Sequence, residues 1–275
     1  MQKIRHPTFP LIARLIRTKA ANTAASDILE RELRHPKYQC QVIQLGANTD
    51  PYQPVEKKQF ITRRILEVFD RYQHPVGIIT KSDLVLRDLD ILVPMAAKRL
   101  TSVAISITTL DRDLARKLEP RAPTPMKRLA AIRQLSEAGI PTTVMVAPVI
   151  PALTDHELER IMEAASLAGA SSAVYIMLRL PLEIEGLFEE WLETHAPLKR
   201  DHVLSLMRQA HGGKTYRSKW QERMTGSGPY AQMIRMRYQL ALKKFGLENK
   251  RASERELDTR LFKPPPQKGD QLSLL

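Results

Sequence analysis

Short apolar runs alternate with longer amphipathic segments along most of this chain. The apolar runs cover residues 41–45, 76–80, 102–107, 142–147 and 173–178. Between them, apolar residues recur at helical spacing over 57–72, 84–99, 112–117, 125–138 and 155–168. Near-continuous apolar strands joined by helices are typical of a parallel sheet whose faces are covered by helices. The pattern therefore predicts an α/β fold.

Helices are also predicted on either side of this alternation. Residues 26–34 form an amphipathic segment with Ser26 or Asp27 as N-cap, and His35-Pro36 is expected to end it. From residue 183 onward the strand pattern stops, and three amphipathic segments follow. They read GLFEEWLETHAP, HVLSLMRQAHGG and YAQMIRMRYQLALKKFG, and they predict a helical C-terminal extension.

Composition narrows the class of protein. The chain has 275 residues and a net charge of +13, which leaves polyanion binding and plain solubility as open alternatives. No apolar run approaches the about 20 residues of a membrane span, so no membrane partner is expected. Cys40 is the only cysteine, and we expect it to be a small buried hydrophobe in a reducing cytosol. The histidines show no metal-ligand spacing, and no metal site is predicted.

The stretch LGANTDPYQPVE, residues 45–56, concentrates polar side chains between a predicted strand and a predicted helix. Six of them can form hydrogen bonds: Asn48, Thr49, Asp50, Tyr52, Gln53 and Glu56. Pro51 and Pro54 lower the entropic cost of holding these groups in place. Two interpretations remain open, a polar turn and a ligand-binding loop at the carboxyl end of a barrel strand.

This stretch resembles one subgroup of radical S-adenosylmethionine (SAM) proteins, which is distantly related to the spore photoproduct lyases. The resemblance runs from about residue 25 to the C-terminus and includes ITKSD (79–83), SITTLD (106–111), LEPRAPTPMKRLAAI (118–132) and VAPVIPALTD (146–155). It implies a partial (βα)6 TIM-like barrel, here missing its first strand. It also implies a [4Fe-4S] cluster that reductively cleaves SAM to a 5′-deoxyadenosyl radical, with possible action on or near DNA in repair.

This sequence differs from the family at the motif that binds the iron–sulfur cluster. The family carries a CxxxCxxC triplet after its first strand, and this chain has Cys40 alone. One thiolate cannot hold a four-iron cluster. We therefore expect this chain to be N-terminally truncated and inactive alone. The alternative is a non-catalytic SAM-fold remnant that binds nucleic acid or the sliding clamp.

The predicted organisation follows the resemblance. Its parts are a basic N-terminal segment outside the family (1–24), the partial barrel (25–182), the helical extension (183–262) and a flexible tail (263–275).

By resemblance, the cofactor-binding side chains lie at the ends of successive strands. They are Asn48, Thr49, Asp50, Thr80, Lys81, Ser82, Ser106, Thr108, Glu119 and Arg121. Glu119 and Arg121 flank Pro120 and could grip the zwitterionic amino-acid moiety of SAM, or form a loop salt bridge instead.

Two further segments suggest macromolecular partners. A basic stretch interleaved with aromatic residues favours nucleic-acid binding, with a solvated pair of basic helices as the alternative. The residues predicted to bind nucleic acid are Tyr216, Arg217, Lys219, Trp220, Arg223, Arg235 and Arg237, beside Tyr230 and Tyr238. The chain ends in Gln271, Leu272, Ser273, Leu274 and Leu275. This pentapeptide resembles the bacterial sliding-clamp motif, and its alternative is a disordered tail.

Overall fold

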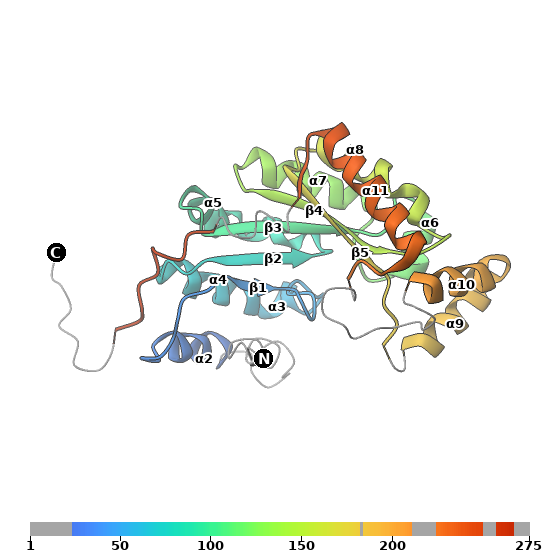
Figure 1. The fold of residues 1–275 in the computed structure, drawn as a ribbon. Helices are drawn as coiled ribbons and strands as arrows, with labels where there is room; N and C mark the ends of the chain where they lie inside the picture. The colour runs from blue at the N-terminus through green and yellow to red at the C-terminus, as the bar shows by residue number, and fades with distance from the viewer. Residues whose placement is uncertain (1–23, 182–183, 211–223, 250–256, 267–275) are drawn as a thin grey trace. The chain divides into compact units, whose positions relative to one another are not determined.

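The computed structural model describes residues 24–181, 184–210, 224–249 and 257–266 (Figure 1). Its strands follow one another in the sheet in chain order, β1-β2-β3-β4-β5-β6. Their bounds are β1 Ile43–Leu45, β2 Val76–Thr80, β3 Thr101–Ile107, β4 Thr142–Val149, β5 Ser172–Met177 and β6 Glu248–Asn249. Strands β1 and β2 pair in parallel, as do β4 with β5 and β5 with β6. The predicted α/β class is confirmed.

The helices alternate with the strands as the pattern predicts. The α-helices are α2 Ala24–Leu33, α3 Glu56–Gln59, α4 Ile61–Arg71, α5 Leu89–Ala97, α6 Arg112–Leu118, α7 Pro125–Glu137, α8 Leu158–Leu167, α9 Ile184–His195, α10 Arg200–Ala210 and α11 Gly228–Phe245. Short 3-10 helices are η1 Asp83–Asp88, η2 Asp155–Glu157 and η3 Pro197–Lys199. None of the helices that the structure describes is long and apolar enough to cross a membrane.

Three local predictions are corrected. Helix α2 begins at Ala24, so Ser26 and Asp27 lie inside the helix and not at its N-cap. The helix predicted over 57–72 is divided at Phe60, whose φ of +52° ends α3 before α4 begins. The C-terminal extension, predicted to be helical, also contributes the short strand β6.

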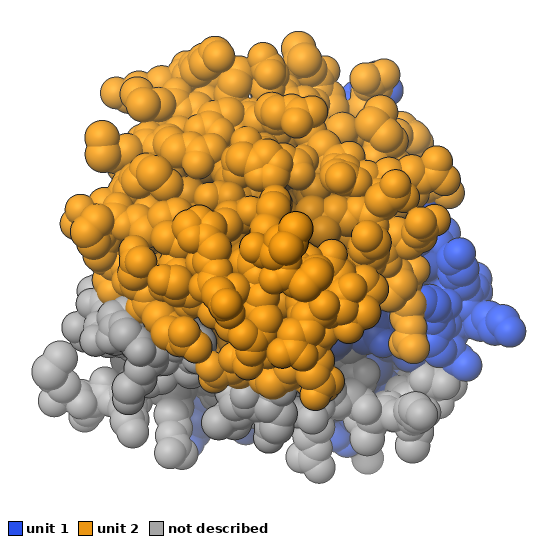
Figure 2. All heavy atoms as spheres, turned by 90° about the vertical axis from the view of Figure 1, so that its right-hand side faces the viewer, with its two compact units in different colours: residues 1–104, 137–141, 254–275 blue, residues 105–136, 142–253 orange. Residues whose placement is uncertain are grey.

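The chain forms two compact units, coloured separately in Figure 2. Unit 1 comprises residues 1–104, 137–141 and 254–275, and unit 2 comprises residues 105–136 and 142–253. In unit 1, α2 packs on α4 through Ala25, Leu29 and Leu33, which are spaced four residues apart and are almost fully buried. The apolar face predicted for this segment is thus the face that enters the core.

An aromatic cluster in unit 1 fixes the segment 257–266, which we call the C-terminal strap. The rings of Tyr38, Phe69 and Phe262 lie 5.1–5.8 Å from the ring of buried His74. Nδ1 of His74 donates to the carbonyl of Pro75 at 3.0 Å, so Nε2 accepts from the Tyr38 hydroxyl at 2.6 Å. The strap is therefore attached to the unit's core by Phe262.

In unit 2, α11 packs along α8 and is held there by polar contacts. Arg237 forms two hydrogen bonds to the carboxylate of Glu159, of 2.7 and 2.6 Å. The Tyr230 hydroxyl donates to Asp155 at 2.7 Å. Tyr238 is buried and donates to the carbonyl of Ala173 in β5 at 2.8 Å. A separate apolar cluster lies between the end of β4 and helices α9 and α10, with Leu192, Val203 and Met207 fully buried.

The buried histidine gives unit 1 a defined pH response. Burial lowers the pKa of His74 to about 4, from the ordinary value of 6.5. As pH falls through about 6.5, the unfolded chain takes up this proton and the folded protein does not, until about pH 4. The free energy of unfolding should therefore decrease across this window, by up to roughly 3 kcal/mol from this residue.

Urea unfolding at a series of pH values measures this effect. The variant His74→Phe should lose much of the decrease between pH 6.5 and 4, whereas the exposed His202→Gln should retain it. Equal pH dependence in the parent protein and in His74→Phe would contradict the assignment.

Candidate functional site

The loop after β1 is built on a close approach between backbones. Gly46 has a φ of +89°, and a Cβ at this position would overlap the backbone carbonyl of Ile79 in β2. Only glycine combines this left-handed conformation with that approach at little cost. Gly46 therefore allows the loop to turn directly over the end of the neighbouring strand.

Asp50 joins this loop to the end of β2. Its Oδ1 accepts hydrogen bonds from the Thr80 hydroxyl at 2.7 Å and from the Tyr52 amide at 2.9 Å. Its Oδ2 accepts from the Lys81 amide at 2.8 Å. The Ser82 amide in turn donates to the Thr80 hydroxyl at 3.0 Å. Four of the predicted residues, Asp50, Thr80, Lys81 and Ser82, are thus brought together at the carboxyl ends of two adjacent strands.

Three other polar residues of the loop, Asn48, Thr49 and Gln53, are exposed or half-buried. Asn48 is exposed, and Thr49 is half-buried. The Thr49 hydroxyl accepts from Nε2 of Gln53 at 3.0 Å. Ser82 has a local structural role as well, because its hydroxyl accepts from the Leu84 amide and caps η1. The loop therefore places amide and hydroxyl groups around a carboxylate that is held by backbone and side-chain donors.

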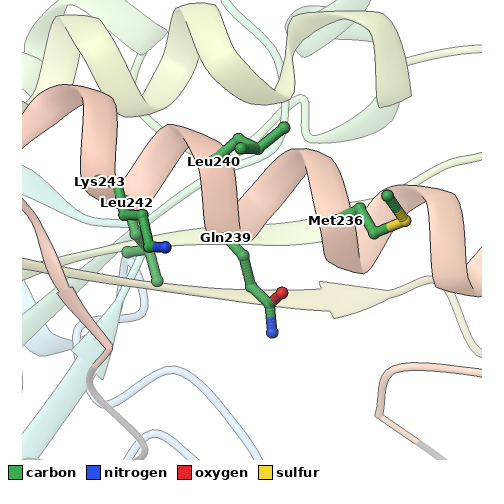
Figure 3. Close-up of a pocket in the computed structure, with 5 residues that line it drawn as sticks. All are labelled: Met236, Gln239, Leu240, Leu242 and Lys243. Carbon is green, nitrogen blue, oxygen red and sulfur yellow. The ribbon is translucent and has the colours of Figure 1, made fainter.

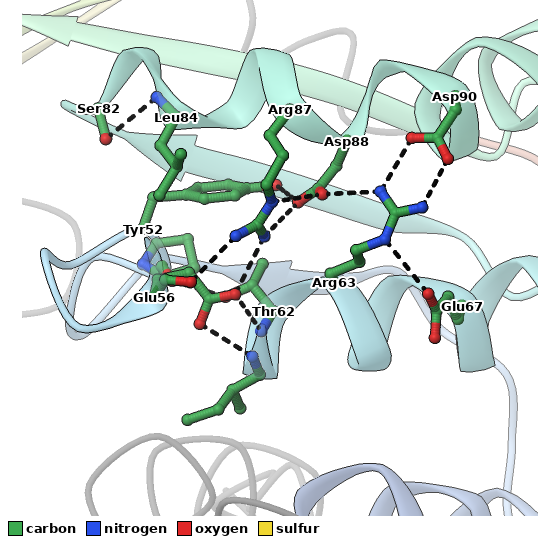
Figure 4. A network of polar contacts seen from close by, with 12 residues as sticks. Tyr52, Glu56, Thr62, Arg63, Glu67, Ser82, Leu84, Arg87, Asp88 and Asp90 are labelled. Carbon is green, nitrogen blue, oxygen red and sulfur yellow. Dashed lines mark hydrogen bonds and ion pairs between the residues drawn. The ribbon is translucent and has the colours of Figure 1, made fainter. Parts of the chain in front are cut away.

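A buried ionic network lies directly behind this loop (Figure 4). The Tyr52 hydroxyl donates to Oδ2 of Asp88 at 3.0 Å, and Asp88 is fully buried. Arg87 binds both oxygens of Asp88 and also reaches the carboxylate of Glu56 at 3.1 Å. Arg63, which lies on α4, forms an ion pair with Asp88 at 3.1 Å. Sequence reasoning did not identify Asp88, Arg87 or Arg63.

Glu56 explains why the helix after the loop is divided. Its two carboxylate oxygens accept from the amides of Ile61 and Thr62, both at 3.0 Å. These amides are among the unsatisfied donors at the start of α4. A carboxylate at this end also interacts favourably with the helix dipole. The last residue of the predicted ligand loop thus serves as the cap of α4.

In unit 2, the predicted hydroxyl groups point to the backbone of β4. The hydroxyls of Ser106 and Thr108 donate to the carbonyl of Ala147 at 2.9 and 3.0 Å. The Thr108 hydroxyl also lies 2.7 Å from a carboxylate oxygen of Glu119, so its single proton is shared between the two acceptors. Both hydroxyl residues are almost fully buried. Ser106, Thr108 and Glu119 therefore form one polar cluster.

The cation of this cluster is Arg128, so the alternative of a loop salt bridge between Glu119 and Arg121 is wrong. Arg128 is 2% exposed and binds Glu119 at 2.6 Å, the carbonyl of Ser106 at 3.0 Å and that of Pro123 at 2.9 Å. Arg121 is exposed. The sequence held a signal for Arg128, because it lies on the apolar stripe of α7 together with Ile132 and Leu135. An arginine on a buried stripe requires an anionic or carbonyl partner.

The predicted nucleic-acid residues are only partly covered by the structure. Tyr216, Arg217, Lys219, Trp220 and Arg223 lie outside the described residues. Arg235 is exposed on α11. The prediction that Tyr238 stacks on a nucleic-acid base is wrong, because its ring is buried. The prediction that Arg237 offers its charge to nucleic acid is corrected as well, because its guanidinium forms an ion pair with Glu159.

Helix α11 also borders a hollow of about 510 Å³ (Figure 3). Among the described residues, it is lined by Met236, Gln239, Leu240, Leu242 and Lys243. Met236 and Leu240 are 63% and 65% exposed, which makes this an open apolar surface. None of these described lining residues was predicted to carry chemistry. The clamp-like residues 271–275 lie outside the described part of the chain.

The residues of this chain do not fit a four-iron cluster. Cys40 is half-buried, not fully buried as predicted, and burial raises the pKa of its thiol to about 11. A thiol with such a pKa is almost entirely protonated at neutral pH and is a poor metal ligand. Within the described ranges, no group of three or more His, Cys, Asp or Glu side chains gathers as a metal site. No reaction step through a cluster can therefore be derived from this chain.

The pairing of Glu119 with Arg128 makes a quantitative prediction. Glu119→Ala should leave a buried guanidinium without its carboxylate and lower the free energy of unfolding by about 3 kcal/mol. Arg121→Ala removes an exposed side chain and should change it by less than about 0.5 kcal/mol. Chemical denaturation of both variants checks this. Similar effects of the two substitutions would contradict the Glu119–Arg128 pairing and favour a loop salt bridge between Glu119 and Arg121.

Comparison with known proteins places the chain among its relatives. The sequence model of the radical SAM superfamily matches residues 17–165. Uncharacterised proteins of Mycobacterium tuberculosis (strain ATCC 25618 / H37Rv) and Mycobacterium bovis (strain ATCC BAA-935 / AF2122/97) are each 36% identical over 177 residues, which is 64% of this chain and 52% of theirs. The chain thus spans about half the length of these curated relatives.

A solved structure supports the fold independently. A spore photoproduct lyase mutant with bound AdoMet and dinucleoside spore photoproduct superimposes with a TM-score of 0.60. The match covers 82% of this chain and 65% of that one, at 15% sequence identity, and so concerns the fold alone. The superfamily model matches more than half of the chain, over strands and loops that also form the strand-end site. This protein therefore belongs to the radical SAM superfamily.

Proposed function

We propose that this protein binds SAM through the loop at Asp50 and belongs to a radical SAM system that acts on or near DNA in the cytoplasm, in repair. The observation that carries the proposal is the junction at Asp50, where polar groups from two strand ends converge. This convergence lies in a chain of the radical SAM superfamily. Ligand sites in barrels with parallel strands lie at this carboxyl end.

The donor set of the loop suits the amino-acid moiety of SAM. The Asn48 amide oxygen and the Thr49 hydroxyl can accept hydrogen bonds from an ammonium group. The ammonium group of Lys81 can bind a carboxylate or ribose hydroxyls. SAM, when bound, would supply the 5′-deoxyadenosyl group for radical chemistry. The contribution of this chain is to bind and orient it, since its own residues do not fit the cluster.

The proposed action near DNA rests on electrostatics and on fold similarity. A net charge of +13 attracts polyanions. Arg235 adds an exposed guanidinium on α11. The similar spore photoproduct lyase structure holds a dinucleoside photoproduct, which is a property of that protein. For this chain, action on or near DNA is part of the proposal.

Calorimetry with SAM tests the proposed function directly. The protein should bind SAM with a weak but saturable signal, and Asp50→Ala should reduce the affinity at least about tenfold, because the hydrogen bonds that join the loop to the end of β2 are lost. The exposed Asp27→Ala serves as a control and should bind like the parent. Absence of saturable binding by a folded parent protein would reject the proposal.

A second candidate function is non-catalytic binding to a bacterial sliding clamp through Gln271, Leu272, Ser273, Leu274 and Leu275. The observation that favours it is the C-terminal strap. The Lys263 amide donates to the carbonyl of Tyr72 at 2.9 Å, and Pro265 is buried. The chain is therefore fixed to unit 1 only a few residues before the pentapeptide.

Deletion of residues 271–275 tests this second candidate. The full chain should co-elute with a purified bacterial sliding clamp, and the deletion should abolish co-elution, because the leucines that would fill the apolar pockets are removed. Lys268→Ala, just before the pentapeptide, should co-elute like the parent. Unchanged co-elution after the deletion would exclude this tail as the clamp ligand.

A further inference from the structure

Tyr52 is tied to the candidate site from both of its ends. Its amide donates to Asp50, and its hydroxyl donates to the buried carboxylate of Asp88. Burial raises the pKa of Tyr52 well above its ordinary value, and the charge of Asp88 adds to the shift. The phenol therefore stays protonated and remains a donor at neutral pH. One residue thus connects the ligand loop to η1.

The charge of Asp88 is compensated by two arginines from different elements. Nε of Arg87 lies 2.8 Å from Oδ1, and Nη2 lies 2.9 Å from Oδ2. Nη1 of Arg63 lies 3.1 Å from Oδ1. Burying a carboxylate away from water costs free energy unless cationic or hydrogen-bonding partners surround it. Asp88 is therefore held in one position, and it offers Tyr52 an acceptor at a fixed place.

Arg87 extends the same network to the end of the loop. It donates to the backbone carbonyl of Glu56 at 3.0 Å and to its carboxylate at 3.1 Å (Figure 4). Its guanidinium also lies 4.7 Å from the centroid of the Phe60 ring. The loop is consequently fixed at three points, which are Asp50, Tyr52 and Glu56. The exposed Asn48 and the half-buried Thr49 come just before the first of them.

We infer that Tyr52, acting through Asp88, is a positioning residue that holds the Asp50 loop in its ligand-binding shape. This inference rests on the proposed binding of SAM. Tyr52 is 3% exposed, so it orients the loop from behind and need not touch the ligand. A loop that is already ordered before binding loses less conformational entropy when the ligand arrives. The hydrogen bond to Asp88 should therefore contribute to SAM affinity without any contact to SAM.

Two substitutions separate this role from general stability. Tyr52→Phe removes only the hydroxyl that reaches Asp88. Asp90→Asn is the matched control, because Asp90 binds the same Arg63 at 2.9 and 2.6 Å but is 59% exposed. We expect Tyr52→Phe to weaken SAM binding roughly tenfold in calorimetry. Asp90→Asn should keep the parent affinity within about twofold.

Hydrogen exchange of the amides in residues 47–53 provides a second measurement that does not require SAM. Tyr52→Phe should raise the exchange rate in this segment and leave β2 and α4 unchanged, whereas Asp90→Asn should match the parent. If Tyr52→Phe lowers the melting temperature but changes neither loop exchange nor SAM affinity, Tyr52 is merely structural and the inference is overturned.

The two proposals fail in different ways. If the parent protein binds no SAM, the proposed function is rejected, and loop exchange alone decides whether Tyr52 orders the loop. If the parent binds SAM and Tyr52→Phe binds it equally well with unchanged loop exchange, the positioning role is rejected and the proposed function stands.

Discussion

The carboxylate of Asp50 accepts a side-chain hydroxyl and two backbone amides, and the geometry of the candidate site depends on these bonds. They join a loop that follows β1 to the end of β2, where each strand alone would leave polar groups unpaired. Gly46 makes this junction possible, because any side chain there would meet the backbone of Ile79. The site is thus a consequence of how two parallel strands end, and the ionic network behind Tyr52 then limits the conformations of the loop.

The strands and helices were predictable because their signals are local. The predicted strands 76–80 and 102–107 agree with β2 and β3 to within one residue, since an apolar run between polar flanks marks a buried strand directly. The break at Phe60 was not predictable in this way. It results from Glu56 capping α4, and a propensity pattern cannot show that a carboxylate will prefer the amides of Ile61 and Thr62 to solvent.

The site was predictable in its residue types but not in its partners. The polar content of residues 45–56 indicated either a polar turn or a ligand-binding loop, and Asp50 does meet Thr80 and Lys81. The partners behind the loop are distant in sequence, with Tyr52 and Asp88 separated by 36 residues. Glu119 illustrates the same limit. Its neighbour in sequence, Arg121, is exposed, and the helical geometry of α7 brings Arg128 to it instead.

The loop does not need an iron–sulfur cluster to acquire its shape. The hydrogen bonds described around Asp50, Tyr52 and Glu56 come from carboxylates, hydroxyls, guanidinium groups and backbone groups of the chain itself. Binding of an iron–sulfur cluster requires cysteine thiolates, and none of the described groups that shape this loop is a thiolate. Under the proposed function, SAM recognition would depend on the loop and radical formation on thiolate ligands, so the two rest on separate sets of residues. SAM affinity measured on this chain would accordingly report on the loop alone.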